Sequence, residues 1–257
     1  VNILYEQLSE NTNTTKFIPT SIESKTIKNN FKFQKEIELK NIHFNYKQNN
    51  NFNIKNISFR IKKGESIGLV GKSGSGKSTI LNIILGLLEP NRGEITFDSL
   101  NVKKINGWNK DIGYVPQSVY LTDDSILNNI AFGVGKDLLK SKKVRKALEK
   151  AQLSQFVATL PKKEKTIVGE KGVRLSGGQI QRIGIARALY HNPSILVLDE
   201  ASSALDYKTE SSLMGAVNLL KGKTTMIIVT HRISTVDKCD KIIEIKNGKI
   251  NEIIKNK

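Results

Sequence analysis

The run GKSGSGKS at residues 71–78 constrains the fold of this chain more than any other feature. The run SIGLV at residues 66–70 precedes it and predicts a short buried strand, and the apolar segment 78–88 that follows predicts a helix. Two glycines separated by four residues and followed by Lys77 and Ser78 fit the P-loop pattern. A strand, a glycine-rich loop and a helix in this order predict an α/β domain.

The loop also predicts a nucleotide site. Its glycines allow sharp turns, so that backbone N–H groups point at phosphate oxygens, and the N-terminal end of the helix adds positive potential. Lys77 would bridge the β- and γ-phosphates, and the Ser78 hydroxyl would ligate Mg²⁺. We therefore expect ATP and Mg²⁺ as cofactors. The predicted nucleotide contacts in the loop are Gly71, Lys72, Ser73, Gly74, Ser75, Gly76, Lys77, Ser78 and Thr79.

Two further apolar runs lead to residues with catalytic chemistry. Residues 195–198 run directly into Asp199 and Glu200, and residues 226–229 are followed closely by His231. Both runs are typical of central parallel strands. Asp199 would hold Mg²⁺ through water, and Glu200 as a general base would polarise the water that attacks the γ-phosphate. The His231 imidazole would donate a hydrogen bond to the γ-phosphate and orient the water and Glu200.

The remaining periodic segments predict sheets and a surface helix. Alternating apolar residues indicate a strand over residues 36–46, with a break in register, and another over residues 57–61, together an antiparallel sheet. Residues 241–254 read as two strands around Asn247-Gly248, a dipeptide that favours a type I′ hairpin turn. Residues 137–153 carry apolar positions on one side and lysines on the other, which predicts an amphipathic helix.

Composition bears on where such a domain works. The longest apolar run, residues 80–88, is far shorter than the ~20 residues needed to cross a bilayer. The one cysteine, Cys239, cannot form an internal disulfide, which fits a reducing, cytosolic setting. The histidines His43 and His191 are interpreted as structural. The net charge of +17 is spread along the whole chain and indicates compositional bias, with a nearby anionic lipid surface as the alternative.

A second anion-binding pattern lies at residues 175–179, which read LSGGQ and continue into IQRIGIARAL. Its serine and glycines are expected at a helix start, where free backbone N–H groups bind anions; an ordinary N-cap would explain the serine alone. The run resembles the signature of ABC transporters, and the resemblance extends from about Glu36 onward. It implies a head-to-tail dimer in which the signature of one copy covers ATP on the P-loop of the other. The signature contacts implied are Ser176, Gly177, Gly178 and Gln179.

The resemblance also implies an architecture and further site residues. The expected fold is α/β, a P-loop NTPase core with a mainly parallel sheet, an antiparallel β subdomain where the chain enters, and a helical signature subdomain at about residues 118–192. Tyr46 resembles the aromatic residue that stacks on adenine, with a half-buried strand tyrosine as the alternative. Gln117, in YVPQ, resembles the glutamine that contacts Mg²⁺ and the attacking water, and residues 203–206 resemble the segment that crosses the dimer interface. The implied catalytic set is Lys77, Gln117, Glu200 and His231, and the implied metal ligands are Ser78, Gln117 and Asp199.

The spacing of the motifs favours a transporter over other ABC ATPases. About a hundred residues separate Lys77 from the signature, whereas the DNA-repair and chromosome-organising members carry a long coiled coil there. A soluble ATPase acting on nucleic acid is therefore the less favoured class, and no nucleic-acid partner is expected. Residues 166–172, TIVGEKG, resemble the loop with which exporter-type domains contact their membrane domain. Residues 1–35 resemble a linker from an upstream transmembrane domain, which leaves 36–257 as the nucleotide-binding domain, and the missing start methionine suggests a fragment.

These features together predict the ATPase of an ABC exporter or flippase at the cytoplasmic face of the plasma (inner) membrane. The expected partners are a second copy, as a homodimer, and a transmembrane domain on the same natural polypeptide. The segment SILNNIAFG at residues 125–133 resembles exporters of lipid-linked saccharides or other amphipathic lipids. Peptide or drug export is the alternative.

Overall fold

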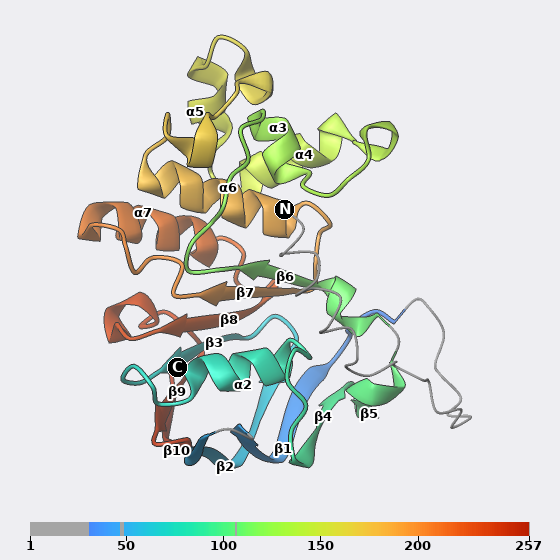
Figure 1. The fold of residues 1–257 in the computed structure, drawn as a ribbon, viewed down its shortest axis with the longest axis vertical. Coiled ribbons are helices and arrows are strands. Elements are labelled where there is room, and N and C mark those ends of the chain that lie inside the picture. Colours follow the sequence, from blue (N-terminus) through green and yellow to red (C-terminus); the bar gives the residue numbers. More distant parts are fainter. Residues whose placement is uncertain (1–30, 47–48, 106, 257) are drawn as a thin grey trace, which may run out of the picture.

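Two β-sheets organise this chain, which the computed structural model describes over residues 31–46, 49–105 and 107–256. The larger sheet has six strands in the order β10-β9-β3-β8-β7-β6, and the smaller sheet has four in the order β2-β1-β4-β5. In Figure 1 the larger sheet crosses the middle of the molecule, with the smaller sheet below it and a group of helices above it. The predicted α/β fold, with its antiparallel and helical parts, is confirmed.

The larger sheet is parallel except at one edge. Neighbouring strands among β3, β6, β7, β8 and β9 pair in parallel, and β10 pairs antiparallel with β9. Every residue of β3 and β8 is buried, which explains why these strands are mostly apolar and lack charged residues. The strands are β3 (Ser66–Val70), β6 (Ile112–Val115), β7 (Ile195–Asp199), β8 (Thr225–Thr230), β9 (Lys241–Lys246) and β10 (Lys249–Lys255).

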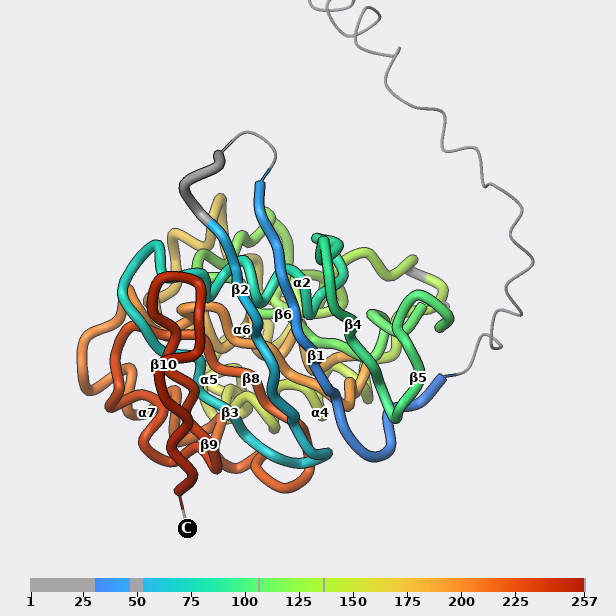
Figure 2. The backbone as a smooth tube through the Cα atoms, turned by 90° about the horizontal axis from the view of Figure 1, so that it is seen from below, coloured from blue at the N-terminus to red at the C-terminus, as the bar shows by residue number. Residues whose placement is uncertain are grey.

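The smaller sheet is antiparallel throughout. It contains β1 (Glu36–Tyr46), β2 (Asn49–Lys62), β4 (Arg92–Phe97) and β5 (Leu100–Asn101). The register of β1 against β2 shifts between Leu39 and Ile42 and again before Phe44, as the broken apolar alternation predicts. Figure 2 shows the hairpin of β9 and β10 beside β2, where the N–H of Lys55 donates to the Gly248 carbonyl over 2.9 Å.

The helices fall into two groups. α2 (Lys77–Ile84) and α7 (Tyr207–Asn218) belong to the core, and the helices between residues 126 and 189 form the upper part of Figure 1. The latter are α3 (Ile126–Ile130), α4 (Ser141–Lys150), α5 (Ser154–Thr159) and α6 (Gly177–Leu189). Short 3-10 helices are η2 (Val102–Lys104), η3 (Trp108–Asp111), η4 (Lys136–Leu138), η5 (Lys163–Lys165), η6 (Glu170–Gly172) and η7 (Ile233–Thr235).

Strand β7 separates two hydrophobic cores. Ile195 and Val197 belong to the core shared with α2 and the smaller sheet, and Leu196 and Leu198 belong to the core shared with the upper helices. Side chains alternate between the two faces of a strand, so four consecutive apolar residues serve both cores. The residues that follow β7 are thus anchored from both sides.

Two predicted helices are wrong in extent. The helix expected over residues 78–88 ends at Ile84, because Gly86 adopts a φ of 73° and the chain turns there. A Cβ at Gly86 would lie 2.7 Å from the Trp108 ring, so the tryptophan packs where a continued helix would run. The single helix expected over residues 137–153 is divided into η4 and the shorter α4. The predicted hairpin turn is confirmed, since Asn247 and Gly248 have φ values of 49° and 73°.

The described part of the predicted 1–35 linker packs on the domain. Phe33 is fully buried and its ring meets that of Phe97 edge-on at 5.8 Å. The N–H groups of Gln34 and Lys35 donate to the Asp98 carboxylate at 2.7 and 2.6 Å. Residues 33–35 thus pack on the domain, and residues 1–30 of the predicted linker lie outside the described residues. Within the described ranges, every helix is too short or too polar to cross a lipid bilayer.

Candidate active site

The phosphate loop, residues 71–76, is shaped by close contacts with the C-terminal hairpin. A Cβ atom added at Gly71 would lie 2.3 Å from the main-chain oxygen of Ile245 in β9. The N–H of Gly248 donates to the Ser75 carbonyl over 2.9 Å. The turn between β9 and β10 therefore packs against the phosphate loop and fixes the path of its main chain.

Lys77 places its ammonium group inside this loop. It is 4% exposed, and Nζ donates to the carbonyl oxygens of Gly71 at 2.9 Å and Lys72 at 3.1 Å. Gly76, with a φ of 113°, precedes the first turn of α2. Among the described residues, the buried Ser75 hydroxyl finds no hydrogen-bond partner. A cation, a helix N-terminus and an unpaired hydroxyl around one loop fit a bound phosphate group.

Two carboxylates follow the end of β7. Asp199 accepts a hydrogen bond from the Tyr114 hydroxyl at Oδ2 over 3.1 Å. Burial raises the pKa of Asp199, and burial together with the Asp199 charge raises the pKa of Tyr114 to about 12. Glu200 has a φ of 48°, a region that glutamate rarely adopts, and its N–H is bonded to the Val229 carbonyl at 2.9 Å. Backbone strain of this kind clusters at functional sites.

Neighbouring strand ends bring a histidine and a glutamine to the same edge of the sheet. His231 follows β8, and its Nδ1 lies 3.8 Å from Oε2 of Glu200. Gln117 lies two residues beyond β6 and its Nε2 donates to the Ser203 hydroxyl over 3.4 Å. In open α/β sheets, ligands bind at the carboxyl ends of the strands. Phosphate loop, carboxylates, histidine and glutamine all follow such ends.

A cavity of about 290 Å³ joins the phosphate loop to Tyr46 and Glu200. The Tyr46 hydroxyl lies 3.3 Å from Oγ1 of Thr79 in α2, and the Tyr46 ring meets Phe44 edge-on at 4.9 Å. An aromatic ring, a phosphate loop and a general-base candidate in the lining suit a ligand with a flat base and a phosphate chain. The cavity is lined by Tyr46, Ser73, Gly74, Gly76, Lys77, Ser78, Thr79 and Glu200.

The predicted signature forms the N-terminus of α6. The Ser176 hydroxyl accepts from the N–H of Gln179 at 3.3 Å, and the Gln179 side chain accepts from the N–H of Ser176 at 2.8 Å, which is a capping box. A Cβ at Gly178 would lie 2.5 Å from Cγ2 of Thr209 in α7. None of the described residues that line the phosphate-loop cavity comes from 175–179. Among the described residues, the predicted signature thus stands apart from the cavity at the phosphate loop.

Sequence reasoning missed the tyrosine that contacts Asp199. Tyr114 lies in a strand that pairs with β7, at a position where alternation turns its side chain away from the core. Its place three residues before Gln117, in the same short strand-end segment, is the signal that the sequence offers. It also missed the carboxylate of Glu210, which is buried in α7 and bonded to the segment after Glu200.

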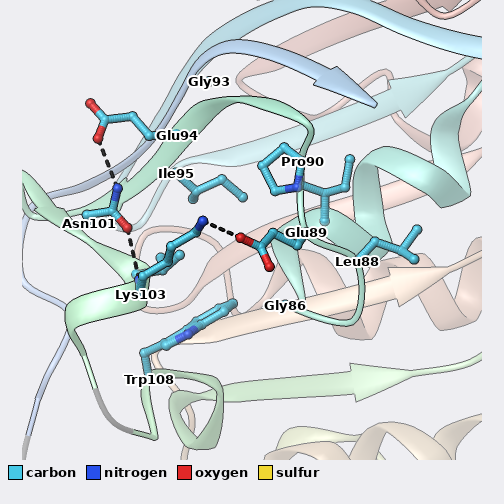
Figure 3. Close-up of a pocket in the computed structure, with 12 residues that line it drawn as sticks. Gly86, Leu88, Glu89, Pro90, Gly93, Glu94, Ile95, Asn101, Lys103 and Trp108 are labelled. Atoms are coloured by element: carbon cyan, nitrogen blue, oxygen red, sulfur yellow. Dashed lines mark hydrogen bonds and ion pairs between the residues drawn. The ribbon is translucent and has the colours of Figure 1, made fainter. Parts of the chain in front are cut away.

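A second hollow lies at the other end of α2 and takes no part in this site. It has a volume of about 220 Å³ and an apolar wall that includes Leu88, Ile95 and Trp108. Figure 3 shows Trp108 along one side and the ion pair of Lys103 with Glu89 across the opening. Because the phosphate loop adjoins the first turn of α2, this hollow is remote from the predicted chemistry.

The comparisons with known proteins identify the family. A protein-family model described as "ABC transporter" matches residues 54–203, more than half of the chain. The chain belongs to the ABC transporter family. As the ATPase domain of an ABC transporter, it binds ATP.

Relatives of this ABC transporter domain are named as a flippase, a transporter and an exporter. It is 42% identical to an ATP-dependent lipid A-core flippase of Pasteurella multocida over 191 residues, 74% of this chain and 33% of that protein. It is 38% identical to the ABC transporter ATM1 of Toxoplasma gondii over 192 residues, 74% of this chain and 17% of that protein. The solved structure of a bacterial Atm1-family ABC exporter with ATP bound superposes with a TM-score of 0.78 at 32% identity, covering 97% of this chain and 44% of that one. The chain therefore spans about a third or less of the curated relatives it matches here.

Proposed function

We propose that this chain is the ATP-hydrolysing domain of an ABC exporter in which two copies close head to tail around ATP. The observation that carries the proposal is the separation of two anion-binding features, the Lys77 loop with its cavity and the capped helix start at Ser176. Neither feature completes a nucleotide site within one copy. A second copy, placed head to tail, brings the signature of each chain over the phosphate loop of the other.

The phosphate loop binds the nucleotide in this proposal. The Lys77 ammonium exchanges its hydrogen bonds to the loop carbonyls, which are 2.9 and 3.1 Å long, for bonds to the β- and γ-phosphates. The N–H groups at the start of α2 donate to the remaining phosphate oxygens. Tyr46 stacks on adenine above the cavity. Mg²⁺, which neutralises phosphate charge when bound, would be held by Ser78, Gln117 and Asp199, oxygen ligands that suit a hard cation.

Glu200 and His231 act on the attacking water. The Glu200 carboxylate accepts its proton as general base, and its unusual backbone conformation holds the carboxylate at the mouth of the phosphate loop. The His231 imidazole, 3.8 Å from Glu200, donates a hydrogen bond to the γ-phosphate. Residues 203–206 cross to the partner copy, and the turn at Ser203 already contacts Gln117.

The coupling surface of the domain is proposed to be Gln117, the segment after it and the loop 166–172. The N–H of Val168 donates to the Asp124 carbonyl and that of Ile126 to the Thr166 carbonyl, each over 3.0 Å. The loop and the start of α3 are thus joined by a short antiparallel contact. We propose that a transmembrane domain on the same polypeptide docks here, at the cytoplasmic face of the membrane.

The proposed substrate is a lipid-linked saccharide or another amphipathic lipid, as the names of the flippase relatives suggest. The test is the full-length protein in proteoliposomes, with ATPase turnover measured against added lipid-linked saccharide and against peptides or drugs. Stimulation by the lipid-linked compound alone supports the proposal. Stimulation by peptides or drugs alone would assign the exporter to the other substrate class.

The variant Glu200→Gln tests the catalytic assignment. It keeps the shape of the side chain but removes the base, so we expect turnover to fall about 100- to 10,000-fold. ATP binding is retained, because the Lys77 loop is unchanged. ATPase activity and molecular mass by light scattering should be measured together, with Mg²⁺ and ATP.

The expected result is an inactive variant that elutes as an ATP-dependent dimer. The matched control is Glu252→Gln on the exposed strand β10, which should hydrolyse ATP like the wild type. Near-normal turnover in Glu200→Gln would show that Glu200 is not the general base. Efficient hydrolysis by a strict monomer would overturn the head-to-tail proposal.

A further inference from the structure

A buried carboxylate in α7 joins three segments around the proposed catalytic residues. Glu210 is 6% exposed. Its Oε1 accepts hydrogen bonds from the hydroxyls of Ser202 at 2.7 Å and Thr235 at 2.8 Å, and its Oε2 accepts from Nη1 of Arg232 at 2.6 Å. Ser202 lies two residues after Glu200, and Arg232 directly follows His231.

Arg232 makes a second contact with the same turn. Its Nη2 donates to the main-chain oxygen of Ser203 over 3.3 Å, and its own N–H donates to the Thr230 hydroxyl at 3.0 Å. The fork of a guanidinium group allows two such bonds in fixed directions. One side chain therefore holds both the Glu210 carboxylate and the main chain of the turn after Glu200.

The turn depends on these contacts for its position. Residues 200–205 form turns between β7 and α7, without a helix or strand of their own. Burial alone would raise the pKa of Glu210, but the hydrogen bonds from Ser202, Thr235 and Arg232 outweigh it and hold that pKa below its usual value. The carboxylate is thus charged at neutral pH, and Arg232 is its cationic partner.

The contacts extend to the groups that would meet the γ-phosphate. The Ser203 carbonyl accepts a hydrogen bond from Arg232. The Ser203 hydroxyl accepts another from Nε2 of Gln117 over 3.4 Å. Glu200 and His231 lie 3.8 Å apart, one just before the Ser202–Ser203 turn and the other just before Arg232. The ion pair of Arg232 with Glu210 connects these two segments. A change in this pair would alter the spacing of Glu200, His231 and Gln117 without touching the phosphate loop.

We propose that Arg232 and Glu210 are positioning residues for ATP hydrolysis, which fix the turn at Ser202–Ser203 against the segment after His231. The proposal rests on the proposed function and assigns a role to two residues that contact no substrate. It requires that the pair affect turnover far more than ATP binding. A purely structural role would instead lower stability and leave the turnover of the folded protein unchanged.

The experiment compares Arg232→Gln, Glu210→Gln and the double variant in steady-state ATPase assays. We expect kcat to fall about 10- to 100-fold in each single variant, since misplacement of catalytic groups by about 1 Å costs that much. KM and the Kd for ATP should change less than about twofold, because the loop around Lys77 is intact. The double variant should be no slower than the singles, since each single already breaks the pair.

The matched control is Arg145→Gln, which breaks the ion pair of Arg145 with Glu164 on the surface of the helical part. It should keep wild-type kcat and KM. A kcat within twofold of that control in both single variants would overturn the proposal. A rise in KM as large as the fall in kcat would overturn it as well. Such a result would leave the proposed function intact, which stands if Glu200→Gln still gives an inactive ATP dimer.

The conservative variant Arg232→Lys decides the matter if the glutamine variants fail to fold. A lysine keeps the charge beside Glu210 but lacks the fork needed to reach Ser203 as well. We expect a folded protein, judged by its thermal midpoint, with kcat reduced about 3- to 10-fold and KM unchanged. Wild-type kcat in Arg232→Lys would overturn the proposal.

Discussion

The contact between the signature helix and α7 leaves no room for a side chain at Gly178. A Cβ there would lie 2.5 Å from Cγ2 of Thr209 and 4.0 Å from Cβ of Thr209. Rotating the threonine away breaks its hydroxyl bond to Asp206, which is 2.6 Å long. Overpacking of this kind costs about 1–3 kcal/mol, and a helix gains at most about 1 kcal/mol from alanine over glycine. We expect Gly178→Ala to lower the free energy of unfolding by about 1–2 kcal/mol.

A second substitution isolates the cause. Thr209→Ser removes the methyl group that clashes but keeps the hydroxyl and N–H that bond to Asp206. Alone it should cost at most about 1 kcal/mol, the value of one buried methyl group. Combined with Gly178→Ala it leaves the Cβ of residue 209 as the nearest atom, at 4.0 Å, an ordinary contact. We therefore expect the two changes to couple favourably by about 1–2 kcal/mol.

Urea unfolding without nucleotide measures this coupling. The absence of ATP matters, because Gly178 is also a proposed contact to the nucleotide of the partner copy. In a thermal scan each kcal/mol corresponds to a shift of about 2–4 °C for a chain of this size. If Gly178→Ala destabilises the chain equally with and without Thr209→Ser, the clash with Thr209 is not the reason for the glycine.

Two further predictions concern charged groups. Lys77→Ala should lower ATP affinity at least about tenfold, because it removes a charge-assisted donor worth about 1.5–3 kcal/mol per hydrogen bond. In a fluorescent-nucleotide titration the exposed Lys146→Ala in α4 serves as control, and unchanged affinity in Lys77→Ala would contradict the loop assignment. Wild type should exceed Glu210→Gln in unfolding free energy by a difference that is largest above pH 4.5, the ordinary carboxyl pKa. The reason is that the pKa of Glu210 in the folded state is lower than that value. The difference should shrink as the pH falls from 4.5 through the folded pKa, and a urea series in which it stays constant down to strong acid would refute this.

Much of the fold could be predicted because the apolar runs are unambiguous. The runs before the phosphate loop and before Asp199 and His231 are buried on both faces, so burial dictates their composition directly. The same reasoning places the polar residues that follow them at one edge of the sheet. Most of the candidate site could therefore be predicted from strand ends and loop chemistry.

The remaining features depend on contacts between distant residues. The helix after the phosphate loop stops early because Trp108 packs against Gly86, and nothing near residue 86 in the sequence reveals that partner. In the sequence Phe33 belongs to a segment that reads as a polar linker, and only the structure shows that its ring packs against Phe97. Glu210 reads as an exposed helix residue, since its partners Ser202 and Arg232 lie on loops of different segments.

The packing of the C-terminal hairpin on the phosphate loop has a consequence for biosynthesis. The loop at residues 71–76 packs against Ile245 and is hydrogen-bonded to Gly248, and both residues are translated some 170 residues later. A nascent chain still on the ribosome lacks this support until the hairpin has left the exit tunnel. ATP affinity should thus appear only once residue 248 has left the tunnel, and a chain truncated before residue 241 would lose nucleotide binding despite keeping every residue proposed to contact the ligand.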